Sequence, residues 1–192
     1  MSKSKKGEII AVSAPSGGGK TTIVKQILKK FPEIVFSVSA TTRPKRESEK
    51  NGVEYYFITE TEFKQKINND EFVEWEKFYD YYYGTFKSVV EENVKYGKSV
   101  LLEVDVKGAI SLKKIYPEAH LIYITPPSFE ELVKRLRERR TESESDMKKR
   151  IERAKMELSV KDKFDYFIDN NDLNKAIKDT SDLINKILNK EK

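Results

Sequence analysis

The sequence has no cysteine, which excludes disulfide bonds, thiolate catalysis and zinc sites built on cysteine. It has one histidine, His120, next to the apolar run at residues 121–124. We expect this histidine to have a structural role at the end of a strand. Any catalytic mechanism must therefore work without a histidine base.

Long apolar stretches are also missing. No run in the sequence approaches the roughly 20 residues that are needed to cross a bilayer. The basic start of the chain is not followed by an apolar segment long enough for a signal peptide. We therefore expect a cytoplasmic protein with no membrane partner.

The excess of positive charge is small and concentrated at one end. The formal net charge is +5, and Lys3, Lys5 and Lys6 supply three of these charges, which leaves +2 for the other residues. A short basic tail does not create a binding face for nucleic acid, so we expect no nucleic-acid partner. The length of 192 residues indicates one enzyme-sized domain. Charged residues make up 36% of the sequence, which indicates a polar surface.

The most informative stretch is APSGGGKTT, at residues 14–22. An apolar run at residues 9–12 precedes it, and a helical pattern begins at Lys20. A strand, a glycine-rich turn and Gly-Lys-Thr at the start of a helix form the context of a P-loop. Such a loop binds phosphate because its glycines let backbone N–H groups converge at a helix N-terminus. The predicted triphosphate-binding residues are Ala14, Pro15, Ser16, Gly17, Gly18, Gly19, Lys20, Thr21 and Thr22.

Two side chains of this loop have predicted roles. Lys20 can reach the β- and γ-phosphates as a mobile charge, and the hydroxyl of Thr21 can hold Mg²⁺. The first position of the motif, where glycine is usual, is Ala14. We interpret the stretch as the binding site of a nucleoside triphosphate.

Strands and helices alternate along most of the chain. Strands are expected at residues 9–12, 34–39, 99–105, 121–125 and 164–168, and helices at 20–30, 88–97, 110–115, 128–140, 147–158 and 173–188. Ser88 and Ser128 are the expected caps of two of these helices. This alternation predicts an α/β fold, a P-loop NTPase-type parallel sheet flanked by helices, with ligands at the carboxyl ends of the strands.

Residues 37–86 differ from their surroundings because they are rich in strands and aromatic residues. We expect, in order, a turn at 51–52, a strand at 53–58, a helix capped by Thr59 and Glu62, and antiparallel strands at 72–78 and 81–86. This block is interpreted as an inserted, strand-rich subdomain. The predicted organisation is core 1–36, insertion 37–86, core 87–127, helical lid 128–160 and core 161–192.

Two carboxylates, Glu103 and Asp105, lie two residues apart in the predicted strand at 99–105 and should point to one face of it. Beside the P-loop, one could organise the Mg²⁺ shell and the other could reach the substrate. The alternative is a pair of acidic residues bonded to a loop at the strand end. The residues alone leave both interpretations open.

Arginines occur at two places where they could face a phosphate. Arg43 and Arg46 follow the end of a predicted strand, and Arg139 and Arg150 flank a polar break between two helices. A transferring phosphoryl group spreads negative charge over its oxygens, and guanidinium groups neutralise that charge without giving up a proton. Charged residues on a helix pair are more often simply solvated, so the positions of Arg139 and Arg150 alone give little support for a phosphate site.

Several separated motifs, in order and with matching spacing, resemble the guanylate kinase family. They are residues 13–22, 37–43, 51–55, 72–75, 82–85, 126–128 and 135–136, followed by Arg139 and Arg150. The resemblance extends over residues 7–188. It implies a P-loop nucleoside monophosphate kinase that transfers the γ-phosphoryl group of ATP to GMP with Mg²⁺ as cofactor, in purine nucleotide metabolism and GMP recycling. It leaves the use of dGMP open.

The resemblance also implies that the insertion binds GMP. Glu74 would accept hydrogen bonds from the guanine N1–H and N2 amino group, the hydroxyls of Ser39 and Thr85 would bind beside it, and Asp105 would lie near the base edge. The GMP phosphate would be bound by Arg43, Arg46, Tyr55 and Tyr83. The implied catalytic residues are Lys20, Arg43, Arg139 and Arg150, and the implied metal ligand is Thr21, with Glu103 acting through water.

The implied chemistry agrees with the residue content. The acceptor is a phosphate that is already anionic at neutral pH, so no general base is needed. Two other functions stay open: phosphorylation of a related substrate such as ribose 1,5-bisphosphate, and a catalytically silent protein-binding module. Such modules typically have damaged phosphate loops, whereas residues 17–21 are intact. The sequence does not indicate an oligomeric state.

Overall fold

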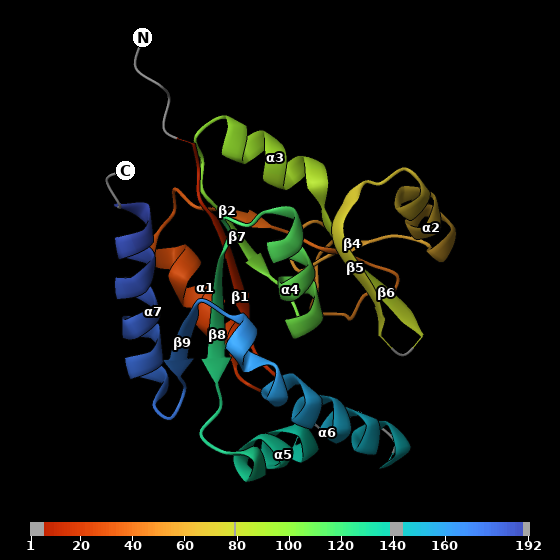
Figure 1. Ribbon diagram of the computed structural model, residues 1–192. Helices are drawn as coiled ribbons and strands as arrows, with labels where there is room; N and C mark the ends of the chain where they lie inside the picture. The colour runs from red at the N-terminus through yellow and green to blue at the C-terminus, as the bar shows by residue number, and fades with distance from the viewer. Residues whose placement is uncertain (1–5, 79, 139–143, 190–192) are drawn as a thin grey trace.

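The computed structural model describes residues 6–78, 80–138 and 144–189. Its centre is a sheet of five parallel strands in the order β2-β7-β1-β8-β9 (Figure 1). These strands are β1 (Ile9–Ser13), β2 (Val35–Ser37), β7 (Val100–Glu103), β8 (His120–Thr125) and β9 (Tyr166–Asp169). The carboxyl ends of parallel strands meet at one edge, and the glycine-rich loop follows β1 at that edge. The predicted α/β fold is confirmed.

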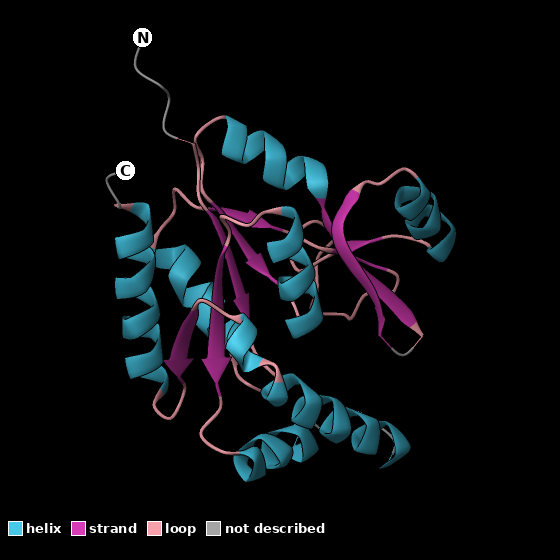
Figure 2. Ribbon diagram, in the orientation of Figure 1, coloured by secondary structure: helices cyan, strands magenta, loops and turns pink. Residues whose placement is uncertain are grey.

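Helices cover both faces of this sheet (Figure 2). One face carries α1 (Lys20–Lys30) and α7 (Leu173–Leu188), and the other carries α3 (Lys87–Lys95) and α4 (Val106–Ile115). Alternate residues of β1 enter the two cores, with Ile10 and Val12 on the first face and Ile9 and Ala11 on the second. A strand that is buried on both faces has a continuous apolar sequence, as β1 does.

A second sheet, of four strands in the order β4-β3-β6-β5, lies beside the first (Figure 1). Its strands are β3 (Ala40–Thr41), β4 (Tyr56–Phe57), β5 (Phe72–Phe78) and β6 (Tyr81–Phe86). Helix α2 (Glu60–Asn68) begins at the predicted capping box of Thr59 and Glu62. Phe63 of α2 stacks on Phe72 with 4.4 Å between ring centroids, so this sheet has a small core of its own.

The strand predicted at residues 53–58 is shorter in the structure. Only Tyr56–Phe57 forms β4, and residues 52–54 form a turn with Gly52 at a φ of 79°. The side-chain oxygen of Asn51 accepts a hydrogen bond from the backbone N–H of Phe57 at 2.8 Å. This bond folds the segment back on itself instead of extending it.

Two predicted element boundaries near the site are wrong. Strand β6 runs directly into α3, so Phe86 takes the N-cap position and Ser88 lies inside the helix. Strand β7 ends at Glu103, and Asp105 is the N-cap of α4, where its carboxylate accepts a hydrogen bond from the N–H of Gly108 at 2.6 Å. Glu103 and Asp105 therefore do not share a strand face.

Two antiparallel helices, α5 (Phe129–Glu138) and α6 (Glu144–Ser159), lie beyond the carboxyl edge of the central sheet (Figure 1). The cap predicted at Ser128 is present, since its hydroxyl accepts from the N–H of Glu131 at 3.1 Å. The pair is held by a cluster of Leu132, Leu136 and Ala154, and a short 3₁₀ helix (Lys161–Lys163) leads to β9. None of the helices in the described residues has the length and apolar character to cross a membrane.

His120 is the first residue of β8, at the amino end of the sheet and therefore opposite the glycine-rich loop. Its Nε2 lies 3.2 Å from Oε2 of Glu8. This position agrees with the expected structural role and keeps the histidine away from the predicted site.

Candidate active site

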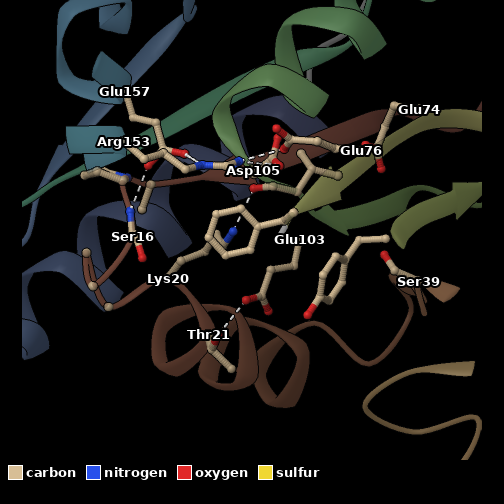
Figure 3. Close-up of a pocket in the computed structure, with 18 of the residues that line it drawn as sticks. Ser16, Lys20, Thr21, Ser39, Glu74, Glu76, Glu103, Asp105, Arg153 and Glu157 are labelled. Carbon is tan, nitrogen blue, oxygen red and sulfur yellow. Dashed lines mark hydrogen bonds and ion pairs between the residues drawn. The ribbon is translucent and has the colours of Figure 1, made fainter. Parts of the chain in front are cut away.

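A cavity of about 320 Å³ opens at the carboxyl edge of the central sheet (Figure 3). Its walls come from the P-loop at residues 14–22, from β5 and β6 of the second sheet, from the end of β7 and from α6. Open parallel sheets bind their ligands at this edge. The cavity therefore brings together the motifs that the sequence singled out.

The P-loop curls because two of its glycines adopt conformations that other residues avoid. Gly17 and Gly19 have φ values of 86° and 88°, and Gly19 is the N-cap of α1. A Cβ on Gly19 would lie only 2.5 Å from Nδ2 of Asn170. These positions require glycine, and the curl directs the N-terminus of α1, with its positive dipole end, into the cavity.

Asn170 supports the loop and was missed by sequence reasoning. It follows β9, and its Nδ2 donates a hydrogen bond to the carbonyl oxygen of Gly18 at 2.9 Å. Its own backbone N–H donates to the carbonyl oxygen of Thr125, at 2.8 Å. A polar residue directly after a parallel strand was the available signal, because such positions face the ligand edge.

The end of β7 meets the first turn of α1 at the mouth of the P-loop (Figure 3). Nζ of Lys20 donates to the carbonyl oxygen of Val104 at 2.7 Å. The hydroxyl of Thr21 donates to Oε1 of Glu103 at 2.5 Å. An ammonium, a hydroxyl and a carboxylate are thus grouped at one place, and the two oxygen ligands are of the type that Mg²⁺ prefers.

Glu74 of β5 lies recessed in the cavity wall. Its strand neighbour on β6 is Thr85, whose hydroxyl donates to Oε1 of Glu74 at 2.6 Å. Removal from bulk water raises the pKa of Glu74 to about 7, and the hydrogen bond from Thr85 acts in the opposite direction. On its other side the carboxylate lies against Gly108, where a Cβ would approach Oε2 to 2.6 Å. Thr85 thus orients one oxygen of the carboxylate, and Gly108 leaves room for the other.

Tyr55 and Tyr83 line the cavity in edge contact, with 6.0 Å between their ring centroids. Removal from bulk water raises the pKa of Tyr55 to about 12, so its hydroxyl stays a donor at neutral pH.

The guanidinium of Arg43 lies 5.6 Å from the centre of the Tyr55 ring. It forms two hydrogen bonds with the carboxylate of Glu49, at 3.0 and 2.7 Å. Sequence reasoning missed Glu49, because this pairing crosses an irregular turn.

The predicted site residues are thus largely brought together. Residues 14–22, Ser39, Tyr55, Glu74, Tyr83, Glu103 and Asp105 line the one cavity, and Thr85 is joined to it through Glu74. Arg43 lies behind Tyr55, while Arg46 and Arg150 are not among the described residues that line the cavity. Arg139 lies outside the described residues.

Arg153 of α6 lines the cavity, although sequence reasoning did not select it (Figure 3). Its Nη2 donates to Oε2 of Glu76 at 2.7 Å and to Oδ2 of Asp105 at 2.9 Å. Its Nε donates to Oε1 of Glu157 at 2.7 Å. The guanidinium also lies over the ring of Phe78, 4.3 Å from its centre. One side chain of α6 therefore contacts both β5 and the N-cap of α4 beside the cavity.

Glu157 extends this connection to the P-loop. Its second oxygen, Oε2, accepts a hydrogen bond from the backbone N–H of Ser16 at 3.0 Å. The spacing of Arg153 and Glu157, one helical turn apart, was a usable sequence signal for an ion pair. Nothing local in the sequence connected Arg153 with the carboxylates of the other two elements.

Glu76 and Asp105 share the same guanidinium but differ in ionisation. Desolvation and the neighbouring Asp105 raise the pKa of Glu76 to about 7. Desolvation acts the same way on Asp105, yet hydrogen bonds from Glu76 and from the N–H of Gly108, with the charge of Arg153, hold its pKa below the usual value. Asp105 is therefore the ionised member of the pair at neutral pH.

This chain is similar to known proteins over nearly its whole length. The family described as guanylate kinase matches residues 6–187. A guanylate kinase of Thermotoga maritima is 46% identical over 172 residues, which cover 90% of this chain and 83% of that protein. A guanylate kinase of Carboxydothermus hydrogenoformans is 47% identical over 174 residues, which cover 91% of this chain and 85% of that protein.

A solved structure agrees with these relatives. The crystal structure of guanylate kinase from Anaplasma phagocytophilum has a TM-score of 0.81 and 32% sequence identity, and the match covers 97% of this chain and 88% of that chain. Fold, sequence and the phosphate loop therefore lead to one assignment. This chain belongs to the guanylate kinase family of nucleoside monophosphate kinases.

Proposed function

We propose that this chain catalyses the Mg²⁺-dependent transfer of the γ-phosphoryl group from ATP to GMP, giving ADP and GDP. The observation that carries the proposal is that the P-loop and the recessed carboxylate of Glu74 face the same cavity. Two nucleotides can meet there end to end, one held by main-chain N–H groups and the other by its base. Positioning of this kind supplies much of the catalysis in phosphoryl transfer.

Guanine is the base that suits Glu74. Its N1–H and N2 amino group are adjacent donors, and an ionised carboxylate can accept from both. Adenine has no N1–H and would leave the carboxylate unpaired, and sites built on such bonds discriminate by a factor on the order of 10⁴. Ser39 and Asp105 line the same cavity, and Thr85 holds Glu74 in place, which supports their proposed roles around the base.

The GMP phosphate would lie near the tyrosine pair. Tyr55 and Tyr83 present hydroxyl donors on the cavity wall, and Glu49 holds the guanidinium of Arg43 beside them. Arg46 is on the same loop, and its backbone N–H donates to Glu49 at 2.8 Å. We propose both arginines as ligands of this phosphate, because guanidinium groups suit phosphate oxygens geometrically.

The transferred phosphoryl group would be met by cations from several elements. The proposed catalytic residues are Lys20, Arg43, Arg139 and Arg150, of which Lys20 lies in the cavity. The acceptor oxygen belongs to a phosphate that is already ionised, so no side chain has to remove a proton. The remaining requirement is exclusion of water, because water is the competing acceptor. Helices α5 and α6 lie where they can cover the site (Figure 1).

Mg²⁺ fits the residues at the mouth of the P-loop. The Thr21 hydroxyl and the Glu103 carboxylate are hydrogen-bonded to each other, and we propose that Thr21 binds the ion directly and Glu103 through water. When bound, the ion neutralises charge on the β- and γ-phosphates. Among the described residues, no cluster of three or more histidine, cysteine, aspartate or glutamate side chains could hold a metal.

The proposed reaction converts GMP to GDP, so the chain would act in purine nucleotide metabolism and in the recycling of GMP, in the cytoplasm. The proposed small-molecule partners are ATP and GMP. The nucleotide dGMP differs from GMP at the ribose 2′ position, and the assay below includes it.

A coupled ADP-release assay tests the proposal directly. ATP and Mg²⁺ are supplied with GMP, dGMP, AMP or ribose 1,5-bisphosphate as the acceptor. We expect strong preference for GMP over AMP, and loss of most of that preference in Glu74→Gln, because an amide cannot accept from both guanine donors. Glu92→Gln, at an exposed position of α3, is the matched control and should behave as the wild type.

Two results would contradict the proposal. If folded wild-type protein produces no ADP with GMP, the chain would instead be a catalytically silent protein-binding module. If ribose 1,5-bisphosphate is turned over faster than GMP, the chain would instead be a kinase of that sugar phosphate. Unchanged base selectivity in Glu74→Gln would show that the base is recognised elsewhere.

A further inference from the structure

Several carboxylates line the cavity of the proposed GMP site. Glu74, Glu76, Glu103 and Asp105 all line the cavity. Two of them are close neighbours, because a Cβ on Gly108 would lie 2.6 Å from Oε2 of Glu74 and 3.2 Å from Oδ1 of Asp105. Neighbouring carboxylates repel each other. A cation that bridges them both offsets this repulsion and holds them in place.

Arg153 is placed to supply that cation. One of its nitrogens, Nη2, donates to both Glu76 and Asp105, at 2.7 and 2.9 Å, and its side chain is 13% exposed. Lys107 also approaches Glu76, at 3.4 Å, but its side chain is 61% exposed. An exposed ammonium is screened by water and holds a partner only weakly. The guanidinium is therefore the stronger partner of this wall.

The contact of Arg153 with Asp105 orients the Asp105 carboxylate in addition to neutralising its charge. Oδ1 of Asp105 accepts from the N–H of Gly108 at 2.6 Å, and Oδ2 accepts from Arg153 at 2.9 Å. With both oxygens bonded to different elements, the carboxylate has a defined orientation. Glu76 lies on β5, two residues from Glu74, so the same guanidinium also connects α6 with the strand that carries the base-recognising carboxylate.

We propose that Arg153 is a positioning residue for GMP recognition, which orients Asp105 at the base-binding wall and joins α6 to β5 through Glu76. The inference rests on the proposed function and adds a residue to it. Because Arg153 is itself bonded to Glu157, and Glu157 to the Ser16 N–H, α6 is tied to the P-loop at the same point. The GMP wall and the phosphate loop are thereby connected through one helix.

The test compares Arg153→Met, Arg153→Gln and Arg153→Lys by ADP release, with KM and kcat measured for each substrate. Removing one partner of a part-buried charge pair leaves the other uncompensated, so we expect the KM for GMP to rise about tenfold or more in Arg153→Met and Arg153→Gln. The KM for ATP should change less than about twofold, because the P-loop main chain and Lys20 remain. Arg153→Lys retains the charge, so its KM for GMP should lie between those of the wild type and of Arg153→Met.

A matched control lies on the same helix. Lys155 is exposed on α6, and Lys155→Met removes one positive charge from the helix without touching the cavity wall. Its KM values should equal those of the wild type. A rise in the KM for GMP similar to that of Arg153→Met would mean that net helix charge, and not the contact with Asp105 and Glu76, is responsible, which overturns the proposal.

A double variant tests the route through Glu76. In Arg153→Met the carboxylate of Glu76 loses its closest cation, so adding Glu76→Ala should lower the raised KM for GMP by about threefold. If the two substitutions change the KM for GMP additively, Arg153 and Glu76 act independently, which would contradict the connection through β5.

The outcomes separate this inference from the proposed function. Wild-type protein that does not phosphorylate GMP would refute the proposed function itself. Active wild-type protein with a normal KM for GMP in Arg153→Met or Arg153→Gln refutes only the role of Arg153. Equal increases in both KM values, or a lower melting temperature with an unchanged KM ratio, would show a merely structural contact. If the methionine variant does not fold, the glutamine variant provides the same comparison.

Discussion

The hydroxyl of Thr85 donates a hydrogen bond to Oε1 of Glu74 at 2.6 Å, across two neighbouring antiparallel strands. The bond exists because the register of β5 and β6 places the two residues opposite each other. Strand pairing in the second sheet therefore decides how the carboxylate is oriented. In the proposed function, that orientation is what distinguishes guanine from adenine.

Replacing Thr85 by valine removes the hydroxyl and keeps the branched shape. Thr85 is 1% exposed, so water cannot take the place of the lost donor. We expect the KM for GMP to rise about tenfold, the typical effect of removing a hydrogen bond to a charged group, with the KM for ATP unchanged. Thr85→Ser retains the donor and is the control. A valine variant with a normal KM for GMP would show that Glu74 is oriented without this bond.

The raised pKa of Glu74 predicts how stability depends on pH. A glutamate in the unfolded chain ionises near 4.5, whereas desolvation raises the pKa of Glu74 to about 7 in the folded protein. Between these values the folded state binds more protons, so the stabilisation is fully present below the lower pKa and is lost as the pH rises through the higher one. Glu74→Gln does not titrate and should lack this loss.

Urea unfolding of both proteins over this pH range measures the effect. Relative to Glu74→Gln, the wild type should lose on the order of 3 kcal/mol of unfolding free energy between the two pKa values, in the absence of nucleotide. Parallel pH profiles of the two proteins would show that Glu74 ionises normally. Glu92→Gln serves as the control, because it removes an exposed carboxylate on α3 that does not line the cavity.

Local features of the sequence were sufficient for much of the fold and for part of the site. The P-loop, the β5–β6 hairpin and the capping box of α2 each depend on residues a few positions apart, so their patterns are visible in one window. The cavity wall depends on distant pairs. Arg153 contacts residues 77 and 48 positions away, and such contacts exist only after the chain has folded.

The error at Asp105 has a physical explanation. An apolar run that ends in alternating acidic residues predicts a longer strand, but aspartate is also among the preferred N-cap residues of helices. In the structure the cap prevails, since the carboxylate accepts a hydrogen bond from the N–H of Gly108. The strand therefore stops at Glu103, which leaves Glu103 beside Thr21 and turns Asp105 toward α6.

Gly108→Ala separates helix stability from site geometry. Gly108 is inside α4, where alanine is a better helix former by about 1 kcal/mol, so the melting temperature should not fall. The added Cβ would lie 2.6 Å from Oε2 of Glu74, and the carboxylate must move aside. We expect the KM for GMP to rise about tenfold, as in other cases where a positioned binding group is displaced, with a normal KM for ATP. An unchanged KM for GMP would show that the carboxylate tolerates the shift.

Asn170→Ala should weaken the binding of ATP and not of GMP, the reverse of the effect expected for Gly108→Ala. Its Nδ2 donates to the carbonyl oxygen of Gly18 at 2.9 Å and lies against Gly19, so it holds the P-loop in its curled form. Losing this bond removes a support of the phosphate-binding N–H groups, and we expect the KM for ATP to rise about fivefold to tenfold with little change for GMP. The neighbouring Asn171 is exposed, and Asn171→Ala is the matched control.

Together with the Gly108 variant, this measurement tests whether the two ends of the cavity bind separately. If Asn170→Ala weakens only ATP and Gly108→Ala weakens only GMP, each nucleotide is held by its own wall. If either variant raises the KM for ATP and the KM for GMP equally, the two walls do not bind their nucleotides independently. Coupling between them would then have to pass through a shared element, and α6 is one element that contacts both, through Glu157 at the P-loop and Arg153 at the GMP wall.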